Sequence, residues 1–330
     1  MTQTLEVLSR RTATLSSIRG IVHTMKTMSA INAVPYERAA QAAESYHQTV
    51  LSGLRAFVIK TGPIAMPVAG QTEKILVVFG SDHGLCGNYN EALAKRAKTE
   101  AAKAGAAKAG AAKAGAGAGA KTDSGVRILC VGVRMSDALS DQGLKPEVTF
   151  LPPASADGIG RLASSIVTRL DKIGGGDVHN RIAVTLLFTQ RTGTGQREPV
   201  VSPLLPLTPS LLSDPAKTGW QSRSLPSYTM QATPLLAALL RNHIFASVFQ
   251  ASAEAMVTEN AARLALMQQA EQAVDERLEE VGGQFRLMRQ DEITNELMDI
   301  IIGFEALKKK SPVIRTSAHL LDLHATTPNK

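Results

Sequence analysis

The turn after the first strand-like apolar run holds the side chains best suited to chemistry. It reads GSDHGLCGN from Gly80 to Asn88 and places an acid, an imidazole and a thiol together as Asp82, His83 and Cys86. These groups could serve as a base and a nucleophile. Residues this close in sequence seldom converge on one reacting atom, so we interpret the segment as a surface turn with a half-buried cysteine.

The glycines of this turn raise a second possibility, phosphate binding, because free N–H groups at a helix start attract anions. The segment lacks the Gly-Lys-Ser/Thr ending of a P-loop. The spacing of Gly80, Gly84 and Gly87 also differs from the dinucleotide fingerprint. The sequence therefore favours a tight turn that needs glycine geometry. We expect no catalytic residue and no cofactor.

Metal binding is not expected either. His319 and His324 lie in a tail rich in Thr, Pro and Lys, and their spacing of five residues is poor for one helix face. No cysteine or acidic pair joins them to complete a ligand set.

Charge and composition exclude further classes of protein. The net charge is +7, and 4% of the residues are aromatic. The segment 101–121 and the tail 308–330 carry the basic excess, so the rest of the chain is nearly neutral. A broad basic surface with stacking aromatics, as nucleic-acid binding requires, is therefore not expected.

Cysteine usage and hydropathy indicate an intracellular protein. Two cysteines, Cys86 and Cys130, cannot build a disulfide framework, which fits a reducing compartment. No run approaches 18 apolar residues, and the start MTQTLEVLSRRT lacks the apolar core of a signal peptide.

The middle of the chain, residues 73–233, alternates strands with helices. Apolar runs predict strands at 74–80, 126–132, 147–150 and 181–190, with one further strand possible after residue 199. Helical patterns lie between them at 88–98 and 159–173. This alternation is typical of an α/β domain with a mainly parallel sheet. Within it, the AAKAG repeats of 101–121 predict a solvated, mobile insert; a basic docking arm is the alternative.

The N-terminal segment, residues 1–62, predicts a long helix. Leu15, Ile18, Val22 and Met25 recur at steps of three and four, and Met28 and Ile31 continue the stripe. Pro35 lacks an N–H and should kink or end the first part of the helix.

The segment 234–307 predicts a second long helix with a coiled-coil seam. At about 1.5 Å per residue it would extend roughly 105 Å, beyond a compact domain. Gly282–Gly283 is the expected weak point, Glu271 is a polar residue within the seam, and 308–330 forms a basic flexible tail. Alternating three- and four-residue steps, with one register skip, link Leu264, Met267, Val274, Leu278, Val281, Phe285, Met288, Ile293, Leu297, Ile300, Phe304 and Leu307.

Three segments together resemble the gamma subunit of F-type ATP synthases. The strongest resemblance lies in ENAARLALM at 259–267 and RQDEITNELMDIIIGFEAL at 289–307. The turn SDHGLCGNYN at 81–90 resembles the family's Ser-Asp-x-Gly-Leu-Cys-Gly motif. IRGIVHTMKTMSA at 18–30 resembles the first long helix, with Met25 at the family's methionine.

This resemblance implies a non-catalytic rotor shaft. N- and C-terminal helices would pair as an antiparallel coiled coil beside a Rossmann-like α/β foot domain. The shaft would pass through a hexamer of alpha and beta subunits, and the foot would rest on the membrane c ring beside epsilon. Rotation would couple proton or sodium transport to ATP synthesis or hydrolysis. The expected location is peripheral, at the cytoplasmic face of the bacterial inner membrane.

The resemblance also implies site residues. Contacts with the alpha/beta hexamer fall on Met25, Arg263, Met267, Arg289, Gln290, Thr294, Glu296, Ile300, Phe304 and Leu307. The last three would lie in a low-friction sleeve. The foot-domain turn consists of Ser81, Asp82, Gly84, Leu85, Cys86 and Gly87.

Two departures from the family pattern indicate a divergent member. INAVPYERA stands where the family has a basic run, and Gly282–Gly283 is unlike the usual seam. We hypothesise a relation to the alternative, often sodium-linked, ATPases that some bacteria carry. Two rival functions stay open: a nucleotide-dependent α/β enzyme, and a coiled-coil adaptor that uses the basic insert and tail.

Overall fold

The structure is a computed structural model that describes residues 4–62, 72–109, 125–175, 181–192, 196–207 and 223–310. The chain divides into two compact units. The larger comprises the described residues of 20–272, and the smaller those of 1–19 and 273–330.

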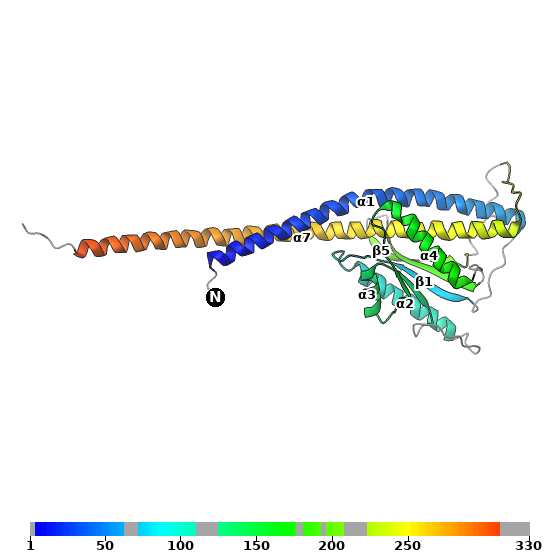
Figure 1. Cartoon of the computed structure of the whole chain (residues 1–330), viewed down its shortest axis with the longest axis horizontal. Helices are drawn as coiled ribbons and strands as arrows, with labels where there is room; N and C mark the ends of the chain where they lie inside the picture. Colours follow the sequence, from blue (N-terminus) through cyan, green and yellow to red (C-terminus); the bar gives the residue numbers. More distant parts are fainter. Residues whose placement is uncertain are drawn as a thin grey trace, which may run out of the picture. The chain divides into compact units, whose positions relative to one another are not determined.

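Two long helices, α1 (Leu5–Thr61) and α7 (Ala232–Lys310), run through the larger unit as an antiparallel pair (Figure 1). Tyr36 and Ala40 of α1 pack with Ala253 and Val257 of α7. Further along α1, Leu54 and its neighbours pack near Leu240, which lies earlier in α7. Residue numbers therefore increase along α1 in the direction in which they decrease along α7. The predicted antiparallel pairing of the terminal helices is confirmed.

The α/β part of this unit contains a five-stranded sheet in the order β3-β2-β1-β4-β5. β1 (Glu73–Phe79) pairs in parallel with β2 (Arg127–Val131) and β4 (Ile182–Arg191), and β2 pairs in parallel with β3 (Val148–Phe150). β5 (Arg197–Leu205) overlaps the region after residue 199 where one further strand was predicted as possible, and it begins two residues before residue 199. It pairs antiparallel with β4. The prediction of a mainly parallel sheet is confirmed.

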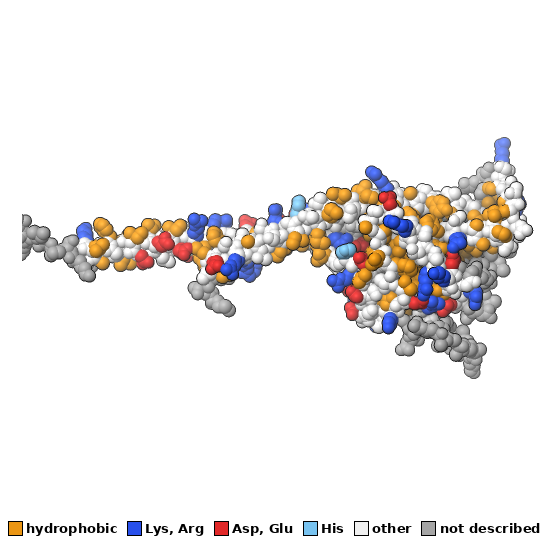
Figure 2. Space-filling model, viewed as in Figure 1, with side chains coloured by type: hydrophobic (Ala, Val, Ile, Leu, Met, Phe, Trp, Pro, Cys, Tyr) orange, Lys and Arg blue, Asp and Glu red, His pale blue; other side chains and the backbone are white. Residues whose placement is uncertain are grey.

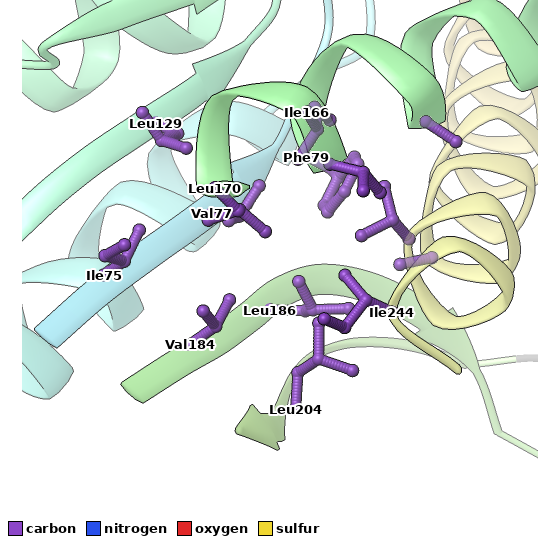
Figure 3. Close-up of a cluster of buried hydrophobic side chains, with 14 of the residues drawn as sticks. Ile75, Val77, Phe79, Leu129, Ile166, Leu170, Val184, Leu186, Leu204 and Ile244 are labelled. Carbon is purple, nitrogen blue, oxygen red and sulfur yellow. The ribbon is translucent and has the colours of Figure 1, made fainter. Parts of the chain in front are cut away.

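Alternation along the parallel strands places apolar side chains on both faces of the sheet. Ile75, Val77 and Phe79 face α4 (Ile159–Gly174) and α7, where Ile166 and Ile244 complete the core (Figure 3). The intervening residues of β1 and β2 face α2 (Tyr89–Ala109) and α3 (Val133–Asp141). The helix α3 and the short 3₁₀ helix η1 (Ala156–Gly158) were not predicted from sequence.

The edge strand β5 contains two prolines, Pro199 and Pro203. Proline has no N–H to donate, so it is tolerated within a sheet mainly at an edge. The two prolines are therefore consistent with β5 being an edge strand, which pairs only with β4 among the described strands.

Of the two effects predicted at Pro35, a kink or an end of the helix, the end is wrong, and the kink stays a prediction. The helix continues through Pro35 to Thr61. Proline removes one internal hydrogen bond, but the next residue, Tyr36, is buried against α7, and its hydroxyl donates to the main-chain oxygen of Pro153 at 3.0 Å. Tertiary packing directly after Pro35 therefore helps to maintain the helix.

The insert and the tail begin as helix. α2 continues to Ala109, and Ala101 at the start of the predicted insert is buried against the sheet. The interpretation as a solvated insert is therefore wrong for Ala101, while Ala102 and Lys103 are exposed; residues 110–121 lie outside the described residues. At the other end α7 reaches Lys310, and the rest of the predicted tail, with His319 and His324, is also outside them.

In the smaller unit, the start of α1 and the second half of α7 form their own apolar contacts. Leu8 and Val281 are each 1% exposed. Arg19 Nε donates to Asp275 Oδ1 at 2.5 Å. α7 also continues through Gly282–Gly283 without interruption.

By length and composition alone, α7 is long and apolar enough to cross a membrane, and it is the one such helix among the described residues. Helices of protein cores meet the same criterion. Ile244 and Val248 of α7 lie in the core against the sheet, which accounts for part of this apolar character.

Candidate functional site

The turn after β1 is closed by its own hydrogen bonds. Ser81 is fully buried; its main-chain N–H donates to Asn90 Oδ1 at 3.0 Å and its hydroxyl donates to the main-chain oxygen of His83 at 2.9 Å. Asn90 Nδ2 donates to Ser81 Oγ at 2.7 Å. Since these groups are engaged within the turn, they are not free to bind a phosphate.

Gly87 and Leu85 have positive φ angles of 66° and 63°, and an added Cβ at Gly84 would meet only open space. The expectation of glycine geometry thus holds for Gly87, while Leu85 adopts the same backbone region at some steric cost.

The arrangement of the acid, imidazole and thiol does not form a nucleophile with its base. Asp82 Oδ1 accepts from the N–H of Val133 at the start of α3, at 3.1 Å. The contact of Cys86 with His83 is to the main-chain oxygen, at 3.9 Å. Cys86 is 5% exposed, which corrects the prediction of a half-buried cysteine, and burial raises the pKa of its thiol. A raised pKa disfavours the reactive thiolate.

Arg263 and Met267, both predicted hexamer contacts, are largely buried on α7. Arg263 Nη2 donates to Glu259 Oε1, one helical turn away, at 2.6 Å. The Arg263 side chain is 12% exposed, and Met267 is 3% exposed. Burial raises the pKa of Glu259, although the Arg263 guanidinium opposes that shift.

A second group of predicted contacts is exposed to solvent in this chain. Every described side chain of α7 from Arg289 onward is exposed, and beyond Val281 no described residue of the helix is buried. Ile300, Phe304 and Leu307 are 67%, 71% and 69% exposed. Figure 2 shows hydrophobic side chains interspersed with charged ones along this part of the helix. The group comprises Arg289, Gln290, Thr294, Glu296, Ile300, Phe304 and Leu307.

The seam predicted over Ile293–Leu307 therefore has no partner helix within the described chain. A row of large apolar side chains this exposed is uncommon on a protein that works alone and marks an interaction surface.

The apolar stripe predicted on α1 is split. Val22 is buried and Met25 is half-buried, but Met28 and Ile31 are 52% and 60% exposed. Ile21 is also exposed, at 61%, and sequence reasoning missed it. The period of the stripe identified a helix but did not distinguish the face toward α7 from the face toward solvent.

Charged pairs between α1 and α7 were also missed. Lys26 and His23 of α1 both contact the carboxylate of Glu271, with His23 Nδ1 at 2.8 Å. The hydrogen bond from Lys26 lowers the pKa of Glu271. The signal was Glu271 itself, a polar residue at an apolar seam position, which requires a cationic partner on the facing helix.

Comparisons with known proteins agree with this arrangement. A family model described as ATP synthase matches residues 4–307. The chain belongs to the ATP synthase gamma family. The gamma chain of Ruegeria pomeroyi is 26% identical over 92% of this chain and 99% of its own length. The gamma chain of Beijerinckia indica is 29% identical with the same coverage of both chains.

A solved structure supports the fold of this gamma-family chain. A chain from the central stalk and c ring of the Tetrahymena thermophila mitochondrial ATP synthase is similar with a TM-score of 0.51 and 19% identity. The match covers 76% of this chain and 99% of that one. The predicted family is confirmed, and gamma chains are non-catalytic subunits of the synthase.

Proposed function

We propose that this chain works as the rotating central shaft of an F-type ATP synthase and transmits motion between a membrane c ring and catalytic beta subunits. The observation that carries this proposal is the exposed end of α7, where Ile300, Phe304 and Leu307 are each at least two-thirds exposed in a family member matched from residue 4 to residue 307. Apolar side chains in that state need a surrounding partner.

A rod with different side chains around its circumference can act on identical partners differently. Each beta subunit would face a different part of the shaft, and each part would stabilise one conformation of that subunit over another. The polar residues Arg289, Gln290, Thr294 and Glu296 would provide these differing contacts. Rotation then changes which subunit is open and which is closed, without chemistry on the shaft.

Two further surfaces fit the same partner. Exposed Ile21, Met28 and Ile31 on α1 form an apolar area in the larger unit. Met25, Arg263 and Met267 are less accessible, so we assign them to support of that region, with contact to the hexamer limited to their exposed atoms. The turn Ser81–Gly87 carries the exposed Leu85 toward solvent.

The remaining partners follow from the family. We assign the α/β part to the foot that contacts epsilon and the c ring, with association to the membrane through the complex only. The location proposed is the cytoplasmic face of a bacterial inner membrane. The two rival functions gain no specific support, since the turn after β1 uses its polar groups internally.

Reconstitution tests the proposal. The chain should co-assemble with alpha, beta, epsilon and c subunits of its own source, and the complex in vesicles should pump ions when ATP is added. Omission of the chain should abolish pumping. A complex that pumps equally well without it, or an alpha/beta hexamer that assembles with an empty centre in its presence, would exclude the shaft function.

A further inference from the structure

The carboxyl end of β4 contacts both long helices. Arg191, the last residue of the strand, forms ion pairs with Glu37 of α1 and with Glu254 of α7. Its Nε lies 3.4 Å from Glu254 Oε1, and its main-chain N–H donates to the same oxygen at 3.1 Å. One residue of the sheet thus holds a carboxylate from each helix.

Buried hydrogen bonds lie close to the ion-pair triad formed by Arg191, Glu37 and Glu254. Thr258 of α7 is fully buried, and its hydroxyl lies 3.1 Å from the main-chain oxygen of Thr189 in β4 and 2.9 Å from that of Glu254 in its own helix, so its proton is shared between the strand and the helix. Tyr89, in the first turn of α2, donates to the main-chain oxygen of Ala255 at 3.0 Å and lies 3.2 Å from Thr258 Oγ1. The ion pairs of Arg191 and the hydrogen bond of Thr258 to Thr189 both involve the last three residues of β4, whereas Tyr89 joins α2 to α7.

These contacts differ in kind from the apolar contacts between the sheet and α7. Other polar contacts join the α/β part to the long helices outside the sheet: Tyr36 of α1 donates to the main-chain oxygen of Pro153, and Arg241 of α7 pairs with Asp171 of α4. The sheet meets α7 elsewhere through apolar side chains such as Leu186, Ile244 and Val248. Apolar contact is non-directional, so it resists separation more than it resists small rotation or sliding. Hydrogen bonds weaken steeply when the angle or distance changes. A planar guanidinium that contacts two carboxylates therefore restrains orientation more than the apolar core does.

We propose that Arg191 fixes the angle between the sheet and the helix pair of α1 and α7. Torque on the α/β part is then transmitted to the two helices with only a small rotation of that part relative to them. This inference rests on the proposed shaft function. Arg191 acts here as a positioning residue, because it contacts neither nucleotide nor transported ion.

The solvent exposure of these three side chains indicates that the triad affects the orientation of the sheet more than the stability of the fold. The side chains of Arg191 and Glu37 are 39% and 41% exposed, while Glu254 is 14% exposed. Exposed ion pairs contribute little to the free energy of unfolding. Loss of the triad should therefore change the angular restraint and leave the folded state intact.

The experiment measures angular fluctuation in the assembled complex. A rod is attached through a cysteine introduced as Ser164→Cys, at an exposed position of α4; the chain's own Cys86 and Cys130 are buried. The hexamer is immobilised and stalled with ADP, and the variance of the rod angle gives the torsional stiffness. Variants are Arg191→Met, which removes the charge, and Arg191→Lys, which keeps it without the planar fork.

The matched control is Arg134→Met. Arg134 pairs with Asp137 within α3 of the same domain and reaches neither long helix through that pair. We expect Arg191→Met to raise the angular variance by up to about twofold, because it removes both side-chain ion pairs of Arg191 while the main-chain hydrogen bond to Glu254 and the other polar contacts remain. Arg191→Lys should give an intermediate value, and Arg134→Met should equal the wild type.

The outcomes separate this inference from the proposed function. If the wild-type complex fails to rotate or pump, the shaft function is wrong. If the wild type works and the variance and the ions pumped per ATP are unchanged in Arg191→Met, the inference is wrong. Should Arg191→Met fail to assemble, Arg191→Lys decides, and a variance equal to the wild type there overturns the proposal.

Discussion

The hydroxyl of Tyr89 in α2 donates a 3.0 Å hydrogen bond to the main-chain oxygen of Ala255 in α7, across 166 residues of sequence. Tyr89 is 6% exposed, and burial raises the pKa of its hydroxyl, so the group stays protonated and remains a donor. The relationship attaches the first helix of the α/β part to the long C-terminal helix.

Tyr89→Phe should therefore destabilise the chain by about 1–2 kcal/mol, because it removes a buried donor while it keeps the ring. Urea unfolding of the purified chain measures the change. Tyr46→Phe is the control, since Tyr46 is 45% exposed and its change should have little effect. Equal stability of Tyr89→Phe and wild type would show that the hydrogen bond contributes nothing net.

A buried histidine pair predicts acid sensitivity. His47 Nε2 of α1 lies 3.2 Å from His243 Nδ1 of α7, with their rings stacked. Burial lowers the pKa of His243 to about 4, and burial also lowers the pKa of His47, against a raising effect of Glu44. Because the folded state binds the proton less readily than the unfolded state, stability is complete above pH 6.5 and falls as the pH decreases toward 4.

For His243 the loss of stability should reach about 3 kcal/mol at pH 4, because its pKa is about 4 in the folded state and about 6.5 in the unfolded state. His243→Gln, which cannot titrate, should flatten this part of the stability profile. Urea midpoints measured at steps from pH 7.5 to 4 provide the test. A wild-type profile as flat as that of the variant between pH 6.5 and 5 would contradict it.

Gly132, between β2 and α3, occupies a position where any larger side chain would clash with the neighbouring main chain. It has a φ of 102°, and a Cβ there would lie 2.4 Å from the main-chain oxygen of Ser81. Gly132→Ala should destabilise the chain by about 1–3 kcal/mol, since the backbone must move or carry strain. Gly84→Ala, in open space, is the matched control. If thermal unfolding gave the same Tm for both variants, the backbone around Gly132 would accommodate the added methyl group without cost, and the prediction would be wrong.

Arg289→Ala combined with Gln290→Ala tests the exposed part of α7. Both residues are exposed, so the purified chain should unfold within about 0.5 kcal/mol of the wild type. The assembled complex should pump fewer ions per ATP, because the proposed contacts of these two residues with beta subunits would be lost. Arg277→Ala, at another exposed arginine of the helix, provides the comparison. Unchanged pumping by the double variant would remove these two residues from the proposed contact set.

Much of the fold was predictable because its patterns are long. The steps of three and four residues from Leu264 to Leu278 identified α7, and apolar runs identified β1 and β4. α3 was missed because its buried side chains are few: Met135, Ala138 and Leu139. The insert was misread at its start because a single alanine, Ala101, is enough to fill the close space between α2 and the sheet.

The candidate site was less predictable, since sequence gives residue type without orientation. Met267 and Phe304 both occupy seam positions, yet one is 3% and the other 71% exposed. Which of them faces a partner depends on where α1 covers α7, a long-range property. Similarly, nothing local to Arg191 connects it to Glu37 and Glu254; only the folded topology brings the three together. The hypothesis of a sodium-linked complex stays a prediction.

Pro199 and Pro203 have a consequence for the life of the subunit before assembly. The outer margin of β5 offers few amide hydrogens, so another polypeptide finds little to pair with there. We therefore expect the unassembled subunit to resist edge-to-edge strand pairing at β5, even though the end of α7 exposes Ile300, Phe304 and Leu307.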